Sequence, residues 1–245
     1  FHAVAFIGDL ADDRFTPTAL RRLDHGPDYY APTAMIDPAG RCLVWGWSWE
    51  AHDASTNPFG RGGVLTVPRQ LTVRGDDLRV EPIDELRSLR GALVASIEGD
   101  FLGDGPHVMS LDAGAAFDLE LTVPAGLDSR LEAEFLASAD GAVRTVAFID
   151  PVAGTVGIDT SRSARTPFGR QAIYEAPLPA GDTTRIMRIL VDGSIIEAFI
   201  DGQALTTRVP VDAEARGVRL IAPGGLHGLS AELWAVTEQA VVFQP

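Results

Sequence analysis

The sequence predicts an all-β fold made largely of antiparallel strands. Short runs rich in Val, Ile, Leu, Thr and aromatic residues recur along the 245 residues, as in half-buried strands. Gly, Asp and Pro interrupt these runs every ~8–12 residues, a spacing typical of an antiparallel sandwich. Only one stretch shows the three- to four-residue apolar spacing of a helix.

The first residues read as an interior strand. Residues 4–8 (VAFIG) closely follow Phe1, without an initiator Met or the pattern of a signal peptide. We therefore expect the chain to be the downstream piece of a longer protein.

The first third of the chain supplies two expected hairpins. Residues 33–37 (TAMID) and 42–49 (CLVWGWSW) are predicted strands, and Pro-Ala-Gly turns the chain between them. Residues 64–73 (VLTVPRQLTV) and 78–82 (LRVEP) form a second pair around the turn RGDD. Because Pro68 cannot donate to a ladder, it predicts an edge or a bulge in the first arm.

One helix is expected between two β regions. Ile83, Leu86 and Leu89 repeat at helical spacing in IDELRSLRG, and Gly91 can end the helix. A lone short helix at this place reads as a linker. The predicted units are an N-terminal β unit (1–81), a helical linker (82–92) and a C-terminal β-sandwich (93–245).

Strand-like runs continue after the linker. The sequence VDGS joins two of them, and Asp-Gly accepts the positive φ of a tight hairpin turn. The expected strands of the sandwich are residues 117–123, 130–138, 143–150, 154–159, 184–193, 194–202, 205–211, 217–223 and 229–236.

The charge and composition exclude several classes of partner. All 20 basic residues are Arg and the net charge is −14, so the summed field repels a polyanion such as nucleic acid. A neutral or cationic substrate suits this field. No run of 18 apolar residues exists, so the sequence predicts no membrane-spanning segment. The single cysteine, Cys42, excludes an intrachain disulfide, and we expect it to be a small buried hydrophobic residue.

The sequence also predicts no metal and no cofactor. No two histidines stand at ligand spacing and no HExxH motif is present. The histidines are His2, His25, His52, His107 and His227. A nucleophilic triad is not indicated, because there is no GxSxG motif and the lone cysteine lacks a nearby partner.

Carboxylates and aromatic residues are densest in LDHGPDYYAPTAMIDPAGRCLVWGWSWE, residues 23–50. Aromatic faces cover the C–H patches of a sugar, and carboxylates accept hydrogen bonds from its hydroxyls. Asp24 and Asp28 stand beside Tyr29 and Tyr30. Turn-forming Asp is the alternative for one of these carboxylates.

The tryptophans of this stretch alternate with small residues. In a strand, Trp45, Trp47 and Trp49 point to one face, and Gly46 and Ser48 point to the other. Three tryptophans on one face are either part of a sugar-binding wall or part of a core. The residues alone leave both interpretations open.

Several segments carry a family resemblance when they are read in order. LDHGPDYYAPTAMIDPAGRCLVWGWSW precedes GVLTVPRQLTVRGDDLRVEPIDELRSLR, and FIDPVAGTVGIDTSRS, RILVDGSIIEAFIDGQALTTRVPV and AELWAV follow. Together they resemble glycoside hydrolase family 32, the invertase, levanase and inulinase family, over nearly the whole chain. The first segment resembles the family's DfYA loop and gW strand, and the second resembles its PReL passage. The departures are His25 where Tyr is usual, Thr160 before Ser161-Arg162, and Ser48 after the Gly-Trp pair.

The resemblance implies a fold and a division of the active site. It implies the last part of a five-bladed β-propeller followed by a β-sandwich. Enzymes of this family release fructose with retention, which requires two carboxyl groups ~5–5.5 Å apart. The family's catalytic carboxylates lie in WMNDPNG, RDP and EC motifs, and none of these occurs in the 245 residues. The resemblance therefore implies no catalytic residue here and a missing N-terminal propeller part that carries these carboxylates.

The same resemblance implies substrate-binding residues. Asp28, Tyr30 and Trp47 match the DfYA and gW positions and are expected to line the substrate pocket, with Asp24 as a further candidate. Trp45 and Trp49 are expected to pack.

The expected function is the C-terminal portion of a β-fructofuranosidase-like glycosidase. Its substrate is sucrose or a fructan, and this chain alone is expected to be inactive as one part of a longer or two-piece enzyme. The alternative is a non-catalytic carbohydrate-binding or structural module, and unpaired propeller edges also suit a subunit interface. The choice among sucrose, inulin and levan, between hydrolysis and fructosyl transfer, and between a cytoplasmic and a secreted location stays open. Arg without Lys indicates a GC-rich bacterial source.

Overall fold

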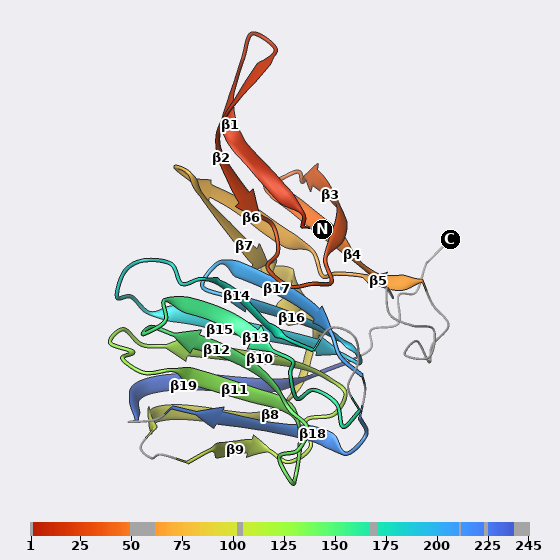
Figure 1. Ribbon diagram of the computed structural model, residues 1–245, viewed down its shortest axis with the longest axis vertical. Coiled ribbons are helices and arrows are strands. Elements are labelled where there is room, and N and C mark those ends of the chain that lie inside the picture. The colour runs from red at the N-terminus through yellow and green to blue at the C-terminus, as the bar shows by residue number, and fades with distance from the viewer. Residues whose placement is uncertain are drawn as a thin grey trace.

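The computed structural model describes residues 2–49, 62–101, 105–166, 171–210, 212–222 and 225–237. The chain forms two β units stacked one on the other (Figure 1). Strands β1–β7 form the N-terminal unit, and strands β8–β19 form a sandwich. The predicted all-β class and the antiparallel sandwich are confirmed.

The N-terminal unit contains two antiparallel sheets. The first is a hairpin of β1 (Val4–Ala11) and β2 (Arg14–Arg22). The second runs in the order β3-β4-β6-β7, and β5 pairs with the end of β4. Its strands are β3 (Tyr30–Ile36), β4 (Cys42–Trp49), β5 (Gly63–Leu65), β6 (Arg69–Arg74) and β7 (Asp77–Pro82).

Pro68 divides the strand that the sequence predicts over residues 64–73. β5 ends at Leu65 and β6 begins at Arg69, because proline has no N–H to donate to the ladder. As a result Arg69 is the first residue of β6, where it is fully buried.

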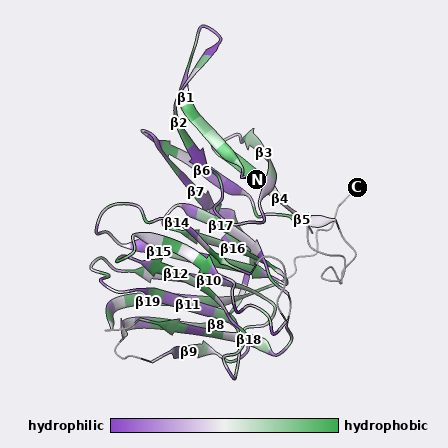
Figure 2. Cartoon of the chain, viewed as in Figure 1, coloured by the Kyte–Doolittle hydropathy of each residue, from purple (hydrophilic) through white to green (hydrophobic). Residues whose placement is uncertain are grey.

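One face of the β1–β2 hairpin is partly buried and the other is exposed. Ala5 and Ile7 pack with Leu78 and Val80 of β7 into a small core. Apolar side chains also lie on the opposite face. Figure 2 shows β1 largely in green, the colour of hydrophobic residues. These exposed side chains are Val4, Phe6, Leu10, Phe15 and Leu20. Apolar residues on both faces are typical of strands that are covered on both sides.

The predicted linker helix is a single 3-10 helix, η2 (Asp84–Leu89), rather than an α-helix that ends at Gly91. Ile83, Leu86 and Leu89 recur every third residue, and this period places them on one side of a 3-10 helix. Gly91 already lies in β8. Among the described residues, no helix has the length and hydropathy needed to cross a membrane.

The sandwich consists of two six-stranded antiparallel sheets. Their orders are β17-β16-β15-β10-β19-β8 and β14-β13-β12-β11-β18-β9. The bounds of the first sheet are β8 (Arg90–Phe101), β10 (Ala116–Val123), β15 (Arg185–Asp192), β16 (Ile195–Ile200), β17 (Gln203–Arg208) and β19 (Leu226–Val236). Those of the second sheet are β9 (His107–Ser110), β11 (Leu131–Ser138), β12 (Thr145–Asp150), β13 (Thr155–Asp159), β14 (Ile173–Pro177) and β18 (Ala215–Ile221).

The main core lies between these two sheets. Alternating side chains of both inner faces fill it, and Phe117 meets Phe135 edge to face with ring centroids 6.3 Å apart. The N-terminal unit sits against the β17 end of the first sheet, and β17 contacts β7 and β4.

The sequence patterns did not predict four of the strands, namely β2, β8, β9 and β14. Each departs from the half-buried pattern on which strand prediction depends. β2 carries Pro17 and is exposed along most of its length. β8, β9 and β14 are edge strands, where alternation of polar and apolar residues is weakest.

Candidate functional site

Three aromatic rings gather at the end of the N-terminal sheet, and we call Tyr30, Trp47 and Trp49 the aromatic cluster. The ring centroids of Tyr30 and Trp49 are 5.7 Å apart in a stacked arrangement. Trp47 lies 6.4 Å from Tyr30 and 6.2 Å from Trp49. Tyr30 is 45% exposed and Trp47 is 37% exposed, so both side chains are accessible from the surroundings.

The strand register brings these rings together. Tyr30 pairs directly with Trp47 across β3 and β4, and cross-strand partners share one face. Trp49 follows two residues later on the same face. A bulge interrupts the ladder between Tyr30 and Thr33, and Ala31 within it has a φ of 45°. A bulge re-aims the neighbouring side chain, here that of Tyr30.

The opposite face of β4 is buried. Gly46 and Ser48 face inward, and a Cβ on Gly46 would lie 2.1 Å from the Tyr29 ring. Glycine at this place therefore lets Tyr29 pack flat against the strand. The alternation of β4 thus separates an exposed aromatic face from an inner face that holds Tyr29.

Asp24 lies in the loop of residues 23–29, and its side chain joins the two units. Its Oδ2 accepts hydrogen bonds from Arg69 Nη1 and Thr206 Oγ1, both at 2.7 Å. Its Oδ1 accepts the N–H groups of Gly26 at 2.7 Å and Thr206 at 2.9 Å. Asp24 is 2% exposed, so both carboxylate oxygens are occupied within the protein.

Asp28 closes the same loop onto the sandwich. Its Oδ2 accepts the N–H of Arg208 at 2.9 Å, and its own N–H donates to the carbonyl of Thr206 at 3.3 Å. The N–H of His25 donates to the carbonyl of Ala204 at 2.8 Å. The loop therefore runs along β17, an edge strand, and covers its free backbone groups.

Arg69 sits between two carboxylates, and we call Asp24, Arg69, Glu197 and Thr206 the ion cluster. Arg69 Nη2 donates to Glu197 Oε2 at 2.7 Å and to Thr206 Oγ1 at 2.5 Å. The guanidinium also lies 4.5 Å from the centre of the Tyr29 ring, within range of a cation–π interaction.

Charge and burial oppose each other in the ion cluster. Burial alone would lower the pKa of Arg69, but Asp24 and Glu197 beside it raise that pKa, so the guanidinium stays charged. Burial raises the pKa of Glu197, against the opposite effect of Arg69. Two carboxylates share one guanidinium, and this arrangement eases protonation of one of them.

A cleft of about 260 Å³ adjoins the aromatic cluster where the two units meet. Tyr30 and Trp49 line it from the N-terminal unit, and Tyr174 lines it from β14. His25 also lines the cleft, and burial lowers its pKa below the usual 6.5. Aromatic side chains thus border the cleft from both units. The lowered pKa favours the neutral form of the His25 imidazole beside them.

No metal site is apparent in the part of the chain that the structure describes. There, no three His, Cys, Asp or Glu side chains are grouped to hold an ion. His52 lies outside the described residues. Cys42 is a free thiol and is only partly buried, whereas the sequence predicted a buried residue.

Two family models match the chain in sequence order. The model described as the N-terminal domain of glycosyl hydrolases family 32 matches residues 1–82, and the model of the C-terminal domain matches residues 85–237. The chain belongs to glycoside hydrolase family 32.

Relatives within the family support this membership. A levanase of a Bacillus species is 30% identical over 90% of this chain and 26% of its own length. A sucrose-6-phosphate hydrolase of Zymomonas mobilis is 28% identical over 89% of this chain and 43% of its own length. The chain therefore spans less than half of the length of either relative.

Solved structures of the family share the fold. An exo-inulinase from Aspergillus awamori superposes with a TM-score of 0.82 at 21% identity, over 95% of this chain and 49% of that one. A fructan 1-exohydrolase from Cichorium intybus gives a TM-score of 0.80 at 18% identity, over 95% of this chain and 54% of that one. The predicted combination of the last part of a propeller with a sandwich is confirmed.

Within this family fold, the four predicted site residues fall into two groups. Tyr30 and Trp47 lie together in the exposed aromatic cluster. Asp24 and Asp28 are 2% and 0% exposed and bind the sandwich, and this burial argues against a direct sugar contact by either carboxylate. Trp49, which the sequence assigned to packing, stacks on Tyr30 and also lines the cleft. Its spacing of two residues from Trp47 was the available signal.

Proposed function

We propose that this chain supplies the aromatic substrate wall and the sandwich of a retaining glycosidase that releases fructose from sucrose or fructans. Membership of glycoside hydrolase family 32 supports the reaction class, and the relatives are named for levan and sucrose 6-phosphate. The observation that carries the proposal is the aromatic cluster, whose exposed rings stand at the family's DfYA and gW positions.

The aromatic cluster suits a fructosyl unit. Sugar rings bind aromatic faces through their C–H groups, and Tyr30 and Trp47 offer two tilted faces 54° apart. Trp49 stacks behind Tyr30 and limits its rotation. Asp24 and Asp28 hold the loop that leads into Tyr30, so their contribution to binding is indirect in this proposal.

The reaction also needs carboxylates that come from a partner. The family's catalytic motifs are absent from these 245 residues, and retention requires a carboxyl pair ~5–5.5 Å apart. The exposed apolar face of the β1–β2 hairpin supports a further propeller part as that partner, because exposed apolar patches mark protein contacts. We therefore propose that the chain alone does not turn over substrate.

The test is an assay of fructose release from sucrose and levan. The chain is assayed alone and after mixing with the N-terminal half of a family relative. We expect no turnover by the chain alone and turnover by the mixture. Release of fructose by the chain alone would overturn the assignment of the catalytic carboxylates to another part.

The alternative function is a non-catalytic carbohydrate-binding module. The complete core of the sandwich favours it, since this unit needs no further strands to bury its apolar residues. Isothermal titration of the chain with sucrose, inulin and levan discriminates the two functions when it is combined with the mixing assay. Binding without turnover in the mixture would favour the module.

A further inference from the structure

Glu197 lies on the sandwich strand β16, yet both of its oxygens serve the N-terminal unit. Its Oε2 accepts a hydrogen bond from Arg69 Nη2 at 2.7 Å, and its Oε1 accepts the N–H of Val67 at 2.8 Å. The residue is 3% exposed. A charge buried this deeply is stabilised only by partners of good geometry, and both Arg69 and Val67 lie across the boundary between the units.

Glu197 Oε2 is connected to Tyr30 through Arg69 and Tyr29. Arg69, held by Glu197, in turn binds Asp24 and lies over the ring of Tyr29. Tyr29 is buried and Tyr30 is exposed, because successive side chains of an extended segment point to opposite sides. The position of Tyr29 therefore fixes the direction in which Tyr30 faces the other rings of the aromatic cluster.

Glu197 Oε1 is connected to Trp47 through Val67 and the strand pairing beside it. Val67 follows Thr66, whose Oγ1 accepts the N–H of Gly46 at 2.9 Å, while the Thr66 N–H donates to the Gly46 carbonyl at 2.9 Å. Gly46 precedes Trp47 on β4. We call the segments that carry Tyr30 and Trp47 the two arms of the aromatic cluster. The Glu197 carboxylate is thus connected to both arms, to the first through Arg69 and to the second through Val67.

We propose that Glu197 is a positioning residue that sets the distance between the two arms of the aromatic cluster. It touches neither ring and acts through Arg69 and Val67. The sandwich then does more than stabilise the fold, because it determines the shape of the sugar-binding wall. The inference that this shape affects sugar affinity rests on the proposed function.

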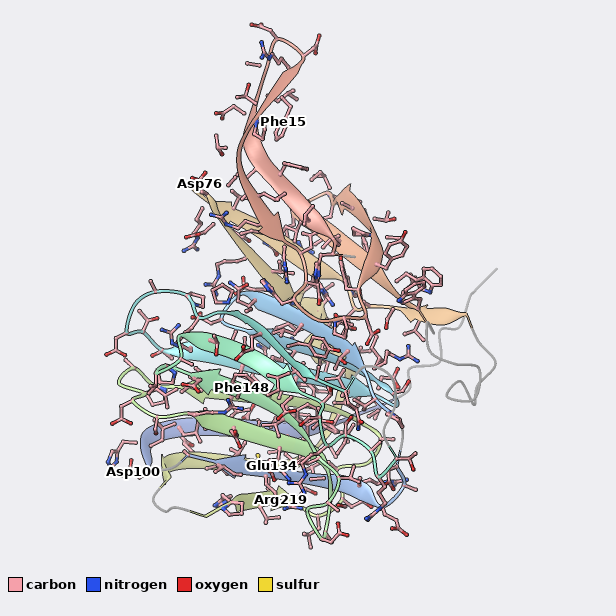
Figure 3. The ribbon with its side chains drawn as sticks, in the orientation of Figure 1. Phe15, Asp76, Asp100, Glu134, Phe148 and Arg219 are labelled. Carbon is pink, nitrogen blue, oxygen red and sulfur yellow. The ribbon has the colours of Figure 1, made fainter. Side chains whose placement is uncertain are left out.

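The test compares Glu197→Gln with a matched control, Glu134→Gln, in the full 245-residue chain. Glu134 is also a buried, ion-paired glutamate of the sandwich, 2.8 Å from Arg144. Figure 3 shows Glu134 beside Arg219, in the half of the sandwich away from the N-terminal strands. A glutamine at position 197 turns an NH₂ group toward Arg69 or toward the Val67 N–H, so it disrupts one arm in either orientation.

Two measurements report on the arms without any sugar. Three of the four tryptophans lie on β4, so near-ultraviolet circular dichroism reports mainly on this strand. Amide exchange at Gly26 and Gly46 reports on the two arms separately. For Glu197→Gln we expect a changed spectrum and about tenfold faster exchange at one or both glycines. For Glu134→Gln we expect neither change. An unchanged spectrum and unchanged exchange in Glu197→Gln would overturn the proposal.

A sugar titration separates this inference from the proposed function. With sucrose and levan oligosaccharides, we expect about tenfold weaker binding to Glu197→Gln and unchanged binding to Glu134→Gln. If the unaltered chain binds neither sugar, the proposed function fails, and the spectrum and exchange rates still decide whether Glu197 positions the cluster. Should Glu197→Gln not fold, Glu197→Asp keeps the charge, shortens the reach and is judged by the same spectrum and exchange rates.

Discussion

The most direct test of the junction between the two units is Arg69→Met. Arg69 is 0% exposed and binds Asp24 and Glu197, each at 2.7 Å. Methionine has a comparable volume, so the substitution removes the charge without opening a large cavity. Two carboxylates are then left buried without a cation, and breaking a buried pair in this way costs about 3–5 kcal/mol.

The loss of the cation–π contacts adds to this cost. The Arg69 guanidinium lies 4.5 Å from the centre of the Tyr29 ring and 5.1 Å from that of Phe199. Such a contact contributes about 2 kcal/mol when desolvated. For a chain of this size, 1 kcal/mol shifts the melting temperature by about 2–4 °C. The expected decrease in melting temperature is therefore about 6–20 °C for the broken ion pairs alone.

The assay is thermal unfolding followed by circular dichroism at neutral pH. A triple variant, Asp24→Asn with Arg69→Met and Glu197→Gln, removes all three charges and is expected to recover part of the loss. If Arg69→Met lowers the free energy of unfolding by less than about 1 kcal/mol, the reasoning is refuted, because water must then reach the two carboxylates.

Three further predictions concern separate features. Trp47→Ala is expected to weaken sucrose or levan binding, measured by titration, by about tenfold. Unchanged affinity would remove Trp47 from the wall. Gly26→Ala places a Cβ 2.0 Å from the Thr206 carbonyl oxygen, so we expect the loop of residues 23–29 to detach, with faster amide exchange in the loop and a lower urea midpoint. Gly105→Ala, where a Cβ meets no atom within 4 Å, is expected to leave the exchange in that loop unchanged. Burial opposes ionisation of Asp118, but hydrogen bonds from Arg188 and Arg90 outweigh it and lower its pKa below 3.8. Ionised Asp118 therefore stabilises the fold fully above the pKa that it has in the unfolded chain, and this stabilisation is lost as the pH falls through its lower pKa in the folded chain. The urea midpoint of Asp118→Asn should consequently fall less steeply in acid than that of the unaltered chain.

Local patterns predicted much of the fold because they depend on near neighbours. The bounds of β4 agree with the predicted strand 42–49, and the alternation of Trp with Gly and Ser separates its two faces as expected. The linker is a 3-10 helix, and the spacing of its three apolar residues fits this helix as well as an α-helix. Neither interpretation could be chosen from spacing alone.

The roles of Asp24 and Asp28 could not be derived from the sequence. Asp24 binds Thr206, and Asp28 binds Arg208, about 180 residues further along the chain, so no local pattern records these contacts. A carboxylate in a Gly-containing loop looks the same whether it binds a sugar, a turn or a distant strand. Only the tertiary arrangement shows that both carboxylates face β17.

The composition of the loop of residues 23–29 follows from two requirements that meet there. On one side the loop must cover the edge strand β17, and it does so with Asp24, Asp28 and backbone N–H groups that pair with the free groups of that edge. On the other side it leads into Tyr30, whose ring must stay exposed to form the wall. Polar residues alone would satisfy the edge, and aromatic residues alone would satisfy the wall. The density of both in one short stretch reflects a segment that fastens the sandwich on one face and presents the aromatic cluster on the other.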